Sequence, residues 1–116
     1  MAHTYVAQDV SYLSGAAIAF GQAVKLSGDA VVPCSVAGEK AFGIAASVAT
    51  AAGETVQVTV GGVCKALFGA ALTAGANVTV NASGRIVAAT SGDAVLGQVA
   101  LAAGNGEIGS VLVDKA

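Results

Sequence analysis

Charged residues are scarce in this 116-residue chain, which has only five Lys or Arg and seven Asp or Glu. They make up 10% of the residues, against roughly 25% in ordinary soluble domains. The net charge is −2 and the basic residues are scattered, so nucleic-acid binding is disfavoured. Two interpretations of the sparse charge stay open. Either many small apolar residues lie harmlessly on strands and loops, or much of the surface is covered in an assembly.

Residues that commonly carry chemistry are also few. The sole histidine, His3, has no carboxylate or second ligand nearby in sequence, so we expect no Ser-His-Asp triad and no multi-histidine metal site. Two cysteines are too few for a disulfide framework. Cys34 and Cys64 lie in valine-rich runs, where cysteine acts as a small buried hydrophobic residue. We therefore expect neither an enzyme nor a bound cofactor or metal.

Long apolar runs are missing too. No run reaches the ~18 residues of a membrane span without an interrupting Gly, Ser, Thr or Asp. The start of the chain lacks the basic region and the continuous apolar region of a secretory signal. These absences predict a soluble intracellular product without a membrane partner.

What the chain does contain is an internal repeat. The stretch 42–60 returns at 96–113: in both, an apolar residue and Gly precede a small alternating strand, an Ala-Ala-Gly turn and a valine-rich strand opened by Gly-Glu. Upstream, 21–26 matches 75–80 and 27–31 is similar to 83–87. We therefore predict two tandem copies of one small β unit, at about 21–60 and 75–113. Because neither copy can bury a sizeable core alone, the halves are expected to share one core.

Strand signals follow one another closely from Gly21 onward. Glycine-rich turns and period-two alternation predict nine strands, at about 23–27, 30–36, 42–48, 54–60, 63–67, 77–80, 85–89, 94–101 and 107–114. Gly28 and Asp29 favour a hairpin between the first two, and Pro33 marks an edge or a break in the second. The segment 68–74 is expected to add at most one helical turn. The pattern predicts an all-β, single-domain barrel or sandwich with little or no helix.

Residues 1–20 differ from the rest of the chain. Both tyrosines, Tyr5 and Tyr12, lie here among polar residues, without clean helical or strand periodicity. We predict a loosely structured N-terminal arm at 1–20, followed by a single β domain at 21–116. The arm is interpreted either as a frayed terminus resting on the body or as a segment that docks on a partner through tyrosine.

Two short motifs hint at cofactors. Residues 104–109 have the spacing of a dinucleotide-binding loop, but only seven residues follow, too few for the helix that would hold a pyrophosphate, so we interpret them as a turn. The surroundings of Lys65 faintly resemble those of the modified lysine in biotinyl and lipoyl carrier domains. That lysine protrudes on a tight hairpin, whereas Lys65 is predicted within a strand.

Several segments share their order and spacing with one protein family: GQAVKL at 21–26, AFGIA at 41–45, AGETVQV at 52–58, GVC at 62–64, AGANV at 74–78 and LGQVA at 96–100. Over residues 21–113 the chain resembles the capsid cement, or head decoration, proteins of tailed bacteriophages. The resemblance implies a small β-barrel or tulip-like structural protein, made in the host cytoplasm. It would bind the outside of the expanded capsid in the virion, commonly as homotrimers, and hold copies of the major capsid protein together.

Such a protein needs no active site, because many weak contacts sum across a lattice. Our hypothesis is that uncharged strand faces mediate self-association and that Tyr5, Val6 and Tyr12 contact the capsid. Deletion of residues 2–13 is then expected to weaken capsid binding and leave the fold intact. The alternative function is a structural β module of a phage tail or surface appendage, with the carrier domain as a further alternative.

Overall fold

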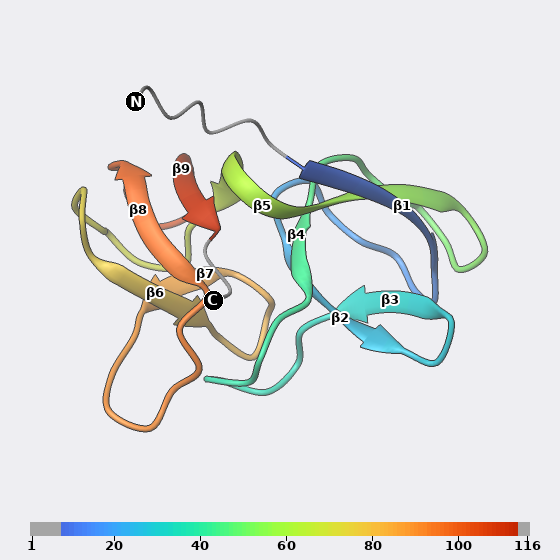
Figure 1. The fold of residues 1–116 in the computed structure, drawn as a ribbon, viewed down its shortest axis with the longest axis horizontal. Helices are drawn as coiled ribbons and strands as arrows, with labels where there is room; N and C mark the ends of the chain where they lie inside the picture. The colour runs from blue at the N-terminus through green and yellow to red at the C-terminus, as the bar shows by residue number, and fades with distance from the viewer. Residues whose placement is uncertain (1–7, 114–116) are drawn as a thin grey trace, which may run out of the picture.

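A computed structural model describes residues 8–113, which form one nine-stranded sheet (Figure 1). The strands are β1 (Gln8–Ser14), β2 (Ala23–Ser27), β3 (Ala30–Pro33), β4 (Gly43–Ala45), β5 (Thr55–Leu67), β6 (Asn77–Val80), β7 (Ile86–Ala88), β8 (Gly97–Leu101) and β9 (Ile108–Val113). These residues contain no helix, and so none that could span a membrane. The predicted all-β fold is confirmed.

The strand pairings close a ring in each half of the chain. β1 pairs antiparallel with β5 and parallel with β3, so the order β1-β3-β2-β4-β5 returns to β1. In the second half the order is β5-β9-β8-β6-β7, and a parallel bridge from Phe68 to Ile86 links β7 back to the end of β5. The molecule therefore consists of two barrel-like rings that share the long strand β5 (Figure 1).

The two rings are copies of one unit, and the unit is longer than the sequence suggested. An isolated bridge joins Ile18 to Ala49, and a second joins Leu72 to Ala103, each end 54 positions later. The same offset makes β1 the equivalent of the second part of β5. The repeat therefore begins at β1 and not at residue 21.

The loose structure expected for the N-terminal arm is not found in residues 8–20. β1 occupies 8–14, and Ile18 is buried in the core with 2% exposure. The physical reason is that β1 closes the first ring, as the second part of β5 closes the other. Tyr5 and Val6 lie outside the described residues.

Other strand predictions need smaller corrections. The hairpin at Gly28 and Asp29 is confirmed, since Ser27 pairs with Ala30, and β3 ends at Pro33. The runs 54–60 and 63–67 form one strand, β5, which continues through two glycines. Residues 68–74, where at most one helical turn was expected, form none, because the backbone there bonds to other segments: Gly69 donates to the carbonyl of Ile86, and Leu72 to that of Ala103.

The core lies in two clusters and not in the single shared core that was expected. The first fills the first ring and contains Ile18, Val24, Val31, Ala45, Ala49, Val56 and Val58. The second surrounds Phe68 and also takes in Ala23, Cys34, Ala41 and Ile44 from the first half. Each ring thus closes around its own side chains, while the second cluster also fills the junction between the rings.

The two cysteines are free thiols, as expected for small hydrophobic residues. Cys34 is buried and Cys64 is half-buried. Burial raises the pKa of each thiol to about 11, so both are protonated near neutral pH. Neither therefore has the lowered pKa of a reactive cysteine.

Gly21 and Gly75 are equivalent positions of the two units that differ in their surroundings. Both have positive φ, +80° and +89°. A Cβ at Gly21 would lie 2.7 Å from the backbone nitrogen of Leu67, whereas at Gly75 it would meet nothing within 4 Å. We expect Gly75→Ala to lower the free energy of unfolding by about 1–2 kcal/mol from backbone strain. Gly21→Ala should cost about 1–3 kcal/mol more from overpacking.

Urea denaturation of both variants measures this difference. Because the two substitutions are chemically identical and share the unfavourable φ, Gly75→Ala is the control for strain alone. Equal losses of stability would contradict the close approach of Gly21 to β5.

Candidate binding surface

The described residues hold no arrangement that suggests catalysis. Within 8–113, no group of three or more His, Cys, Asp or Glu side chains could hold a metal ion. The turn expected at 104–109 is confirmed for 104–107, where the carboxylate of Glu107 accepts the N–H of Gly104 at 2.6 Å, whereas Ile108 and Gly109 already belong to β9. Lys65 lies inside β5, paired with Ser110, and not at a hairpin tip.

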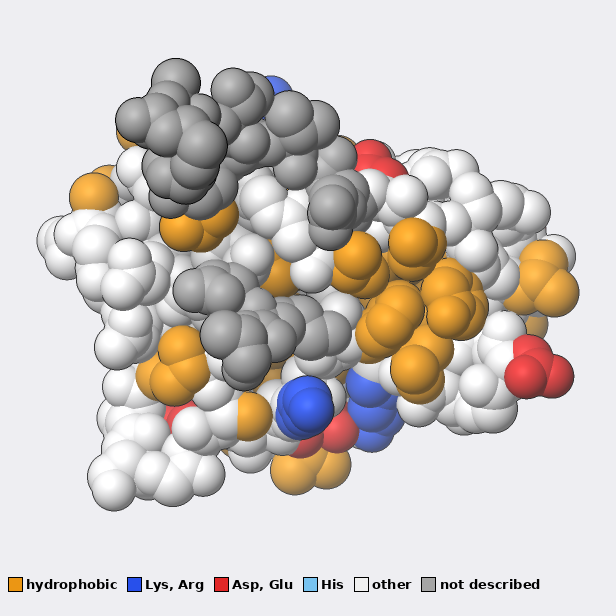
Figure 2. Space-filling model, in the orientation of Figure 1, with side chains coloured by type: hydrophobic (Ala, Val, Ile, Leu, Met, Phe, Trp, Pro, Cys, Tyr) orange, Lys and Arg blue, Asp and Glu red, His pale blue; other side chains and the backbone are white. Residues whose placement is uncertain are grey.

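The first ring carries a groove lined by both apolar and basic side chains. Lys25, Leu26, Lys40 and Phe42 line this groove, whose volume is about 470 Å³. Figure 2 shows hydrophobic side chains gathered over the first ring, with basic side chains beside them. Leu26 is 49% exposed. The groove thus combines two apolar side chains with two lysines.

Tyr12 supports the groove through Phe42. The aromatic side chains of Tyr12 and Phe42 meet edge to face, with ring centroids 5.2 Å apart and an interplanar angle of 68°. Both side chains are half-buried against the first core cluster. Such an aromatic pair contributes about 0.5–1.5 kcal/mol beyond its buried area. The structure thus holds Tyr12 against the body of the protein, next to the groove.

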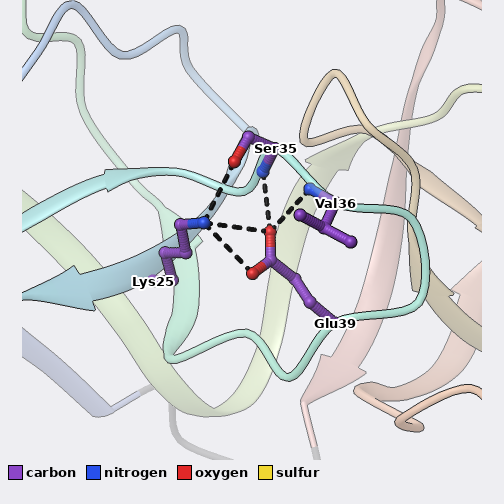
Figure 3. A network of polar contacts seen from close by, with 4 residues as sticks. All are labelled: Lys25, Ser35, Val36 and Glu39. Atoms are coloured by element: carbon purple, nitrogen blue, oxygen red, sulfur yellow. Dashed lines mark hydrogen bonds and ion pairs between the residues drawn. The ribbon is translucent and has the colours of Figure 1, made fainter.

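One edge of the groove is fixed by a polar network (Figure 3). The ammonium of Lys25 forms an ion pair with the Glu39 carboxylate at 3.2 Å and donates to the hydroxyl of Ser35 at 3.0 Å. The same carboxylate accepts the backbone N–H groups of Ser35 and Val36, at 2.7 and 2.8 Å. Partial burial acts to raise the pKa of Glu39, but these N–H groups and Lys25 outweigh it and lower the pKa below its usual value. Lys25 is therefore neutralised within the protein.

Lys40 differs from Lys25 in having no such partner. In the part of the chain that the structure describes, its ammonium makes no hydrogen bond or ion pair. The groove therefore offers one available positive charge beside Leu26 and Phe42. A partner surface that is apolar and carries a carboxylate would match it.

None of the four groove residues was predicted from the sequence. Among the described residues, the sequence pointed only to Tyr12 as a capsid contact. A signal was present in the repeat. Phe42 and Leu26 correspond to Leu96 and Val80 of the second unit, which are only 4% and 1% exposed. The same positions thus carry larger and more exposed side chains in the first unit.

Comparison with known proteins identifies both a family and a fold. The sequence model described as phage cement protein matches residues 3–114. A search of curated proteins found no match. Among solved structures, the N-terminal base of the head fiber protein gp8.5 of bacteriophage phi29 is similar, with a TM-score of 0.72 at 13% identity. The likeness covers 96% of this chain and 97% of that one, and at this identity it shows the fold alone.

Proposed function

This chain belongs to the phage cement protein family, and from that premise we propose that it binds the outer surface of a tailed-phage capsid and stabilises the expanded shell. The observation that carries the proposal is the family match, which spans residues 3–114. It is thus a structural phage protein, and the proposal adds the partner, the major capsid protein, and the site of attachment on the capsid exterior.

The groove supports this proposal because its chemistry suits contact with a protein surface. Lys25, Leu26, Lys40 and Phe42 offer apolar area and one unpaired charge, with no catalytic group among them. A capsid shell presents the same binding site many times. An oligomer that engages several of these sites at once therefore binds tightly, even when each single contact is weak. We propose a homo-oligomer, with a trimer favoured, whose grooves face the capsid.

Tyr5, Val6 and Tyr12 remain part of the proposed capsid contact. Of these, only Tyr12 is described, and it lies beside the groove against Phe42. The deletion of residues 2–13 would also remove β1, which closes the first ring, so an intact fold is no longer expected from it. Deletion of residues 2–7 is the sharper variant, because it spares every described strand.

A second candidate is a module of a surface appendage, as the sequence alternative suggested. The specific observation in its favour is the fold likeness to the base of a head fiber. An appendage would be present in far fewer copies than the capsid protein. Copy number therefore separates the two candidates.

The test is quantitative mass spectrometry of density-purified particles from the natural source. We expect a ratio to the major capsid protein near one to one, because cement covers the whole lattice. A ratio far below this would favour the appendage, and absence from particles would overturn both candidates.

A further inference from the structure

The outer face of the sheet has a different chemical character in each ring, although the backbone pairing is the same. In the first ring, the cross-strand pairs between β1 and β5 that alternate with the core-facing valines are Asp9–Thr59, Ser11–Gln57 and Leu13–Thr55. Of these six side chains all are exposed except that of Thr59, which is 1% exposed. The corresponding pairs between β5 and β9 in the second ring are Val63–Leu112, Lys65–Ser110 and Leu67–Ile108. Equivalent surfaces of the two rings thus carry different side chains and can be compared directly.

Apart from Leu13, the first version is polar, and two of its three cross-strand pairs are hydrogen-bonded. The hydroxyl of Thr59 donates to the carboxylate of Asp9 at 2.7 Å, and the amide of Gln57 donates to the hydroxyl of Ser11 at 2.7 Å. Side-chain pairs of this kind stabilise a sheet that faces water. The first unit therefore folds with a largely polar outer face. The fold itself does not require an apolar face at the equivalent place in the second unit.

The second version is apolar and exposed. We call it the second-ring face and define it by Val63, Lys65, Leu67, Leu101, Ile108 and Leu112. Leu101 is 63% exposed, Ile108 43% and Val63 38%. Lys65 is the one charged residue of the face and has no hydrogen bond or ion pair in the described part of the chain. Exposed apolar patches with few charges mark interaction surfaces.

We propose that the second-ring face binds a second copy of this chain at the end that carries the β2–β3 hairpin. Charge complementarity selects that end. Five of the six described carboxylates accept hydrogen bonds within the chain, those of Asp9, Glu39, Glu54, Asp93 and Glu107. Asp29, exposed at the hairpin tip, has no such partner among the described residues.

The hairpin end is also partly apolar. Leu13 pairs with Ala30, which follows Asp29, and Leu13 is 54% exposed. An acidic group beside an exposed leucine complements Lys65 surrounded by Val63 and Ile108. The contact thus joins apolar area to apolar area and one available cation to one available anion.

The contact runs head to tail. In Figure 1, the strands β8 and β9 and the β2–β3 hairpin lie on opposite sides of the molecule. A face-to-face pairing of two second-ring faces would bring Lys65 toward its own copy, which like-charge repulsion disfavours. A head-to-tail contact avoids this and closes into a ring when the rotation between copies permits. The inference rests on the proposed self-association and not on capsid binding.

The experiment measures the mass of the full chain by light scattering and sedimentation velocity across micromolar concentrations. Val63→Thr with Ile108→Thr makes the face polar and keeps β-branched residues, and position 108 then carries the threonine of its counterpart, Thr55. Lys65→Glu and Asp29→Lys reverse the two charges singly, and their combination restores opposite signs. Lys40→Glu is the matched control, since Lys40 is another unpaired lysine that lies outside the face.

We expect an oligomer for the wild type and for Lys40→Glu. The threonine pair and each single reversal should weaken association by about tenfold or more, and the double reversal should recover most of the loss. A monomeric wild type, a threonine pair with wild-type mass, or a double reversal as dissociated as the single variants would overturn the proposal. Particle copy number is scored separately, so an intact oligomer that is absent from particles counts against the proposed function and not against this interface.

Discussion

Replacement of Phe68 by alanine is expected to lower the free energy of unfolding by about 3–5 kcal/mol. Phe68 is 0% exposed and lies in the second core cluster, at the place where β5 ends. Its backbone is fixed as well, since its N–H donates to the carbonyl of Glu107 and its carbonyl accepts the N–H of Gly106. These hydrogen bonds keep the strand from shifting into the space that the side chain fills. Removal of the side chain therefore leaves a cavity.

The surroundings of Phe68 show how closely the ring is enclosed. A Cβ at Gly109 would lie 2.7 Å from Cε2 of Phe68, so only glycine leaves room for the aromatic ring. Dense packing of this kind relaxes poorly after a large-to-small substitution. We therefore expect the cost to fall within the range of fully buried aromatic residues.

Phe20→Ala is the matched control for this prediction, because it removes the same atoms from a side chain that is 38% exposed. Its cost should be clearly smaller, at about 1–2 kcal/mol, since less area leaves water on folding. Urea unfolding followed by circular dichroism measures both variants. Similar losses for the two would refute the central role of Phe68 in the second ring.

The counterpart of Phe68 in the first ring is Ser14, and the contrast shows how the two units diverged. The Ser14 hydroxyl donates to the carbonyl of Ala51 at 2.8 Å and accepts the N–H of Glu54 at 3.2 Å. The first ring thus uses a buried polar residue to hold the loop before β5. The second ring uses the same position to fill its core.

Local patterns in the sequence were sufficient for much of the fold. Valine alternation identified the strands around Val56 and Val78, and glycine with aspartate placed the β2–β3 hairpin. β1 was missed although Val10 and Tyr12 alternate with Asp9 and Ser11, because its partner β5 lies more than forty residues away. The repeat offered a second signal, since GAAIAFG at 15–21 is similar to GAALTAG at 69–75.

The groove could not be predicted in the same way. Its lining comes from β2 and from the segment before β4, and the partner of Phe42 is Tyr12 on β1. These residues meet because β1 pairs with both β3 and β5, a closure that no local pattern encodes. Nor does the sequence show that Glu39 neutralises Lys25 while Lys40 stays unpaired. Periodicity identifies strands, but a surface assembled from several strands depends on their order in the sheet.

Leu26→Glu is expected to reduce the copy number on capsids by about tenfold or more under limiting protein, because the groove is the proposed capsid contact. A carboxylate at position 26 would be costly to bury against an apolar partner. It would also lie in the same groove as Lys40, where it would compete with a capsid carboxylate for the Lys40 ammonium. A loss of 1.4 kcal/mol per contact is already tenfold in affinity, and an oligomer that binds through several grooves multiplies the effect.

Val48→Glu is the matched control, since Val48 is 55% exposed and Leu26 is 49% exposed, and Val48 does not line the groove. Lys40→Glu is the second groove variant and should lose occupancy while keeping the solution mass of the wild type. Purified variants are added to undecorated capsids, and bound copies are counted by quantitative mass spectrometry, with thermal unfolding as the check on folding. If Leu26→Glu and Lys40→Glu decorated capsids as fully as Val48→Glu, the groove would not be the capsid contact. If the groove variants lost occupancy but kept the solution mass of the wild type, capsid binding would use a surface that self-association does not need.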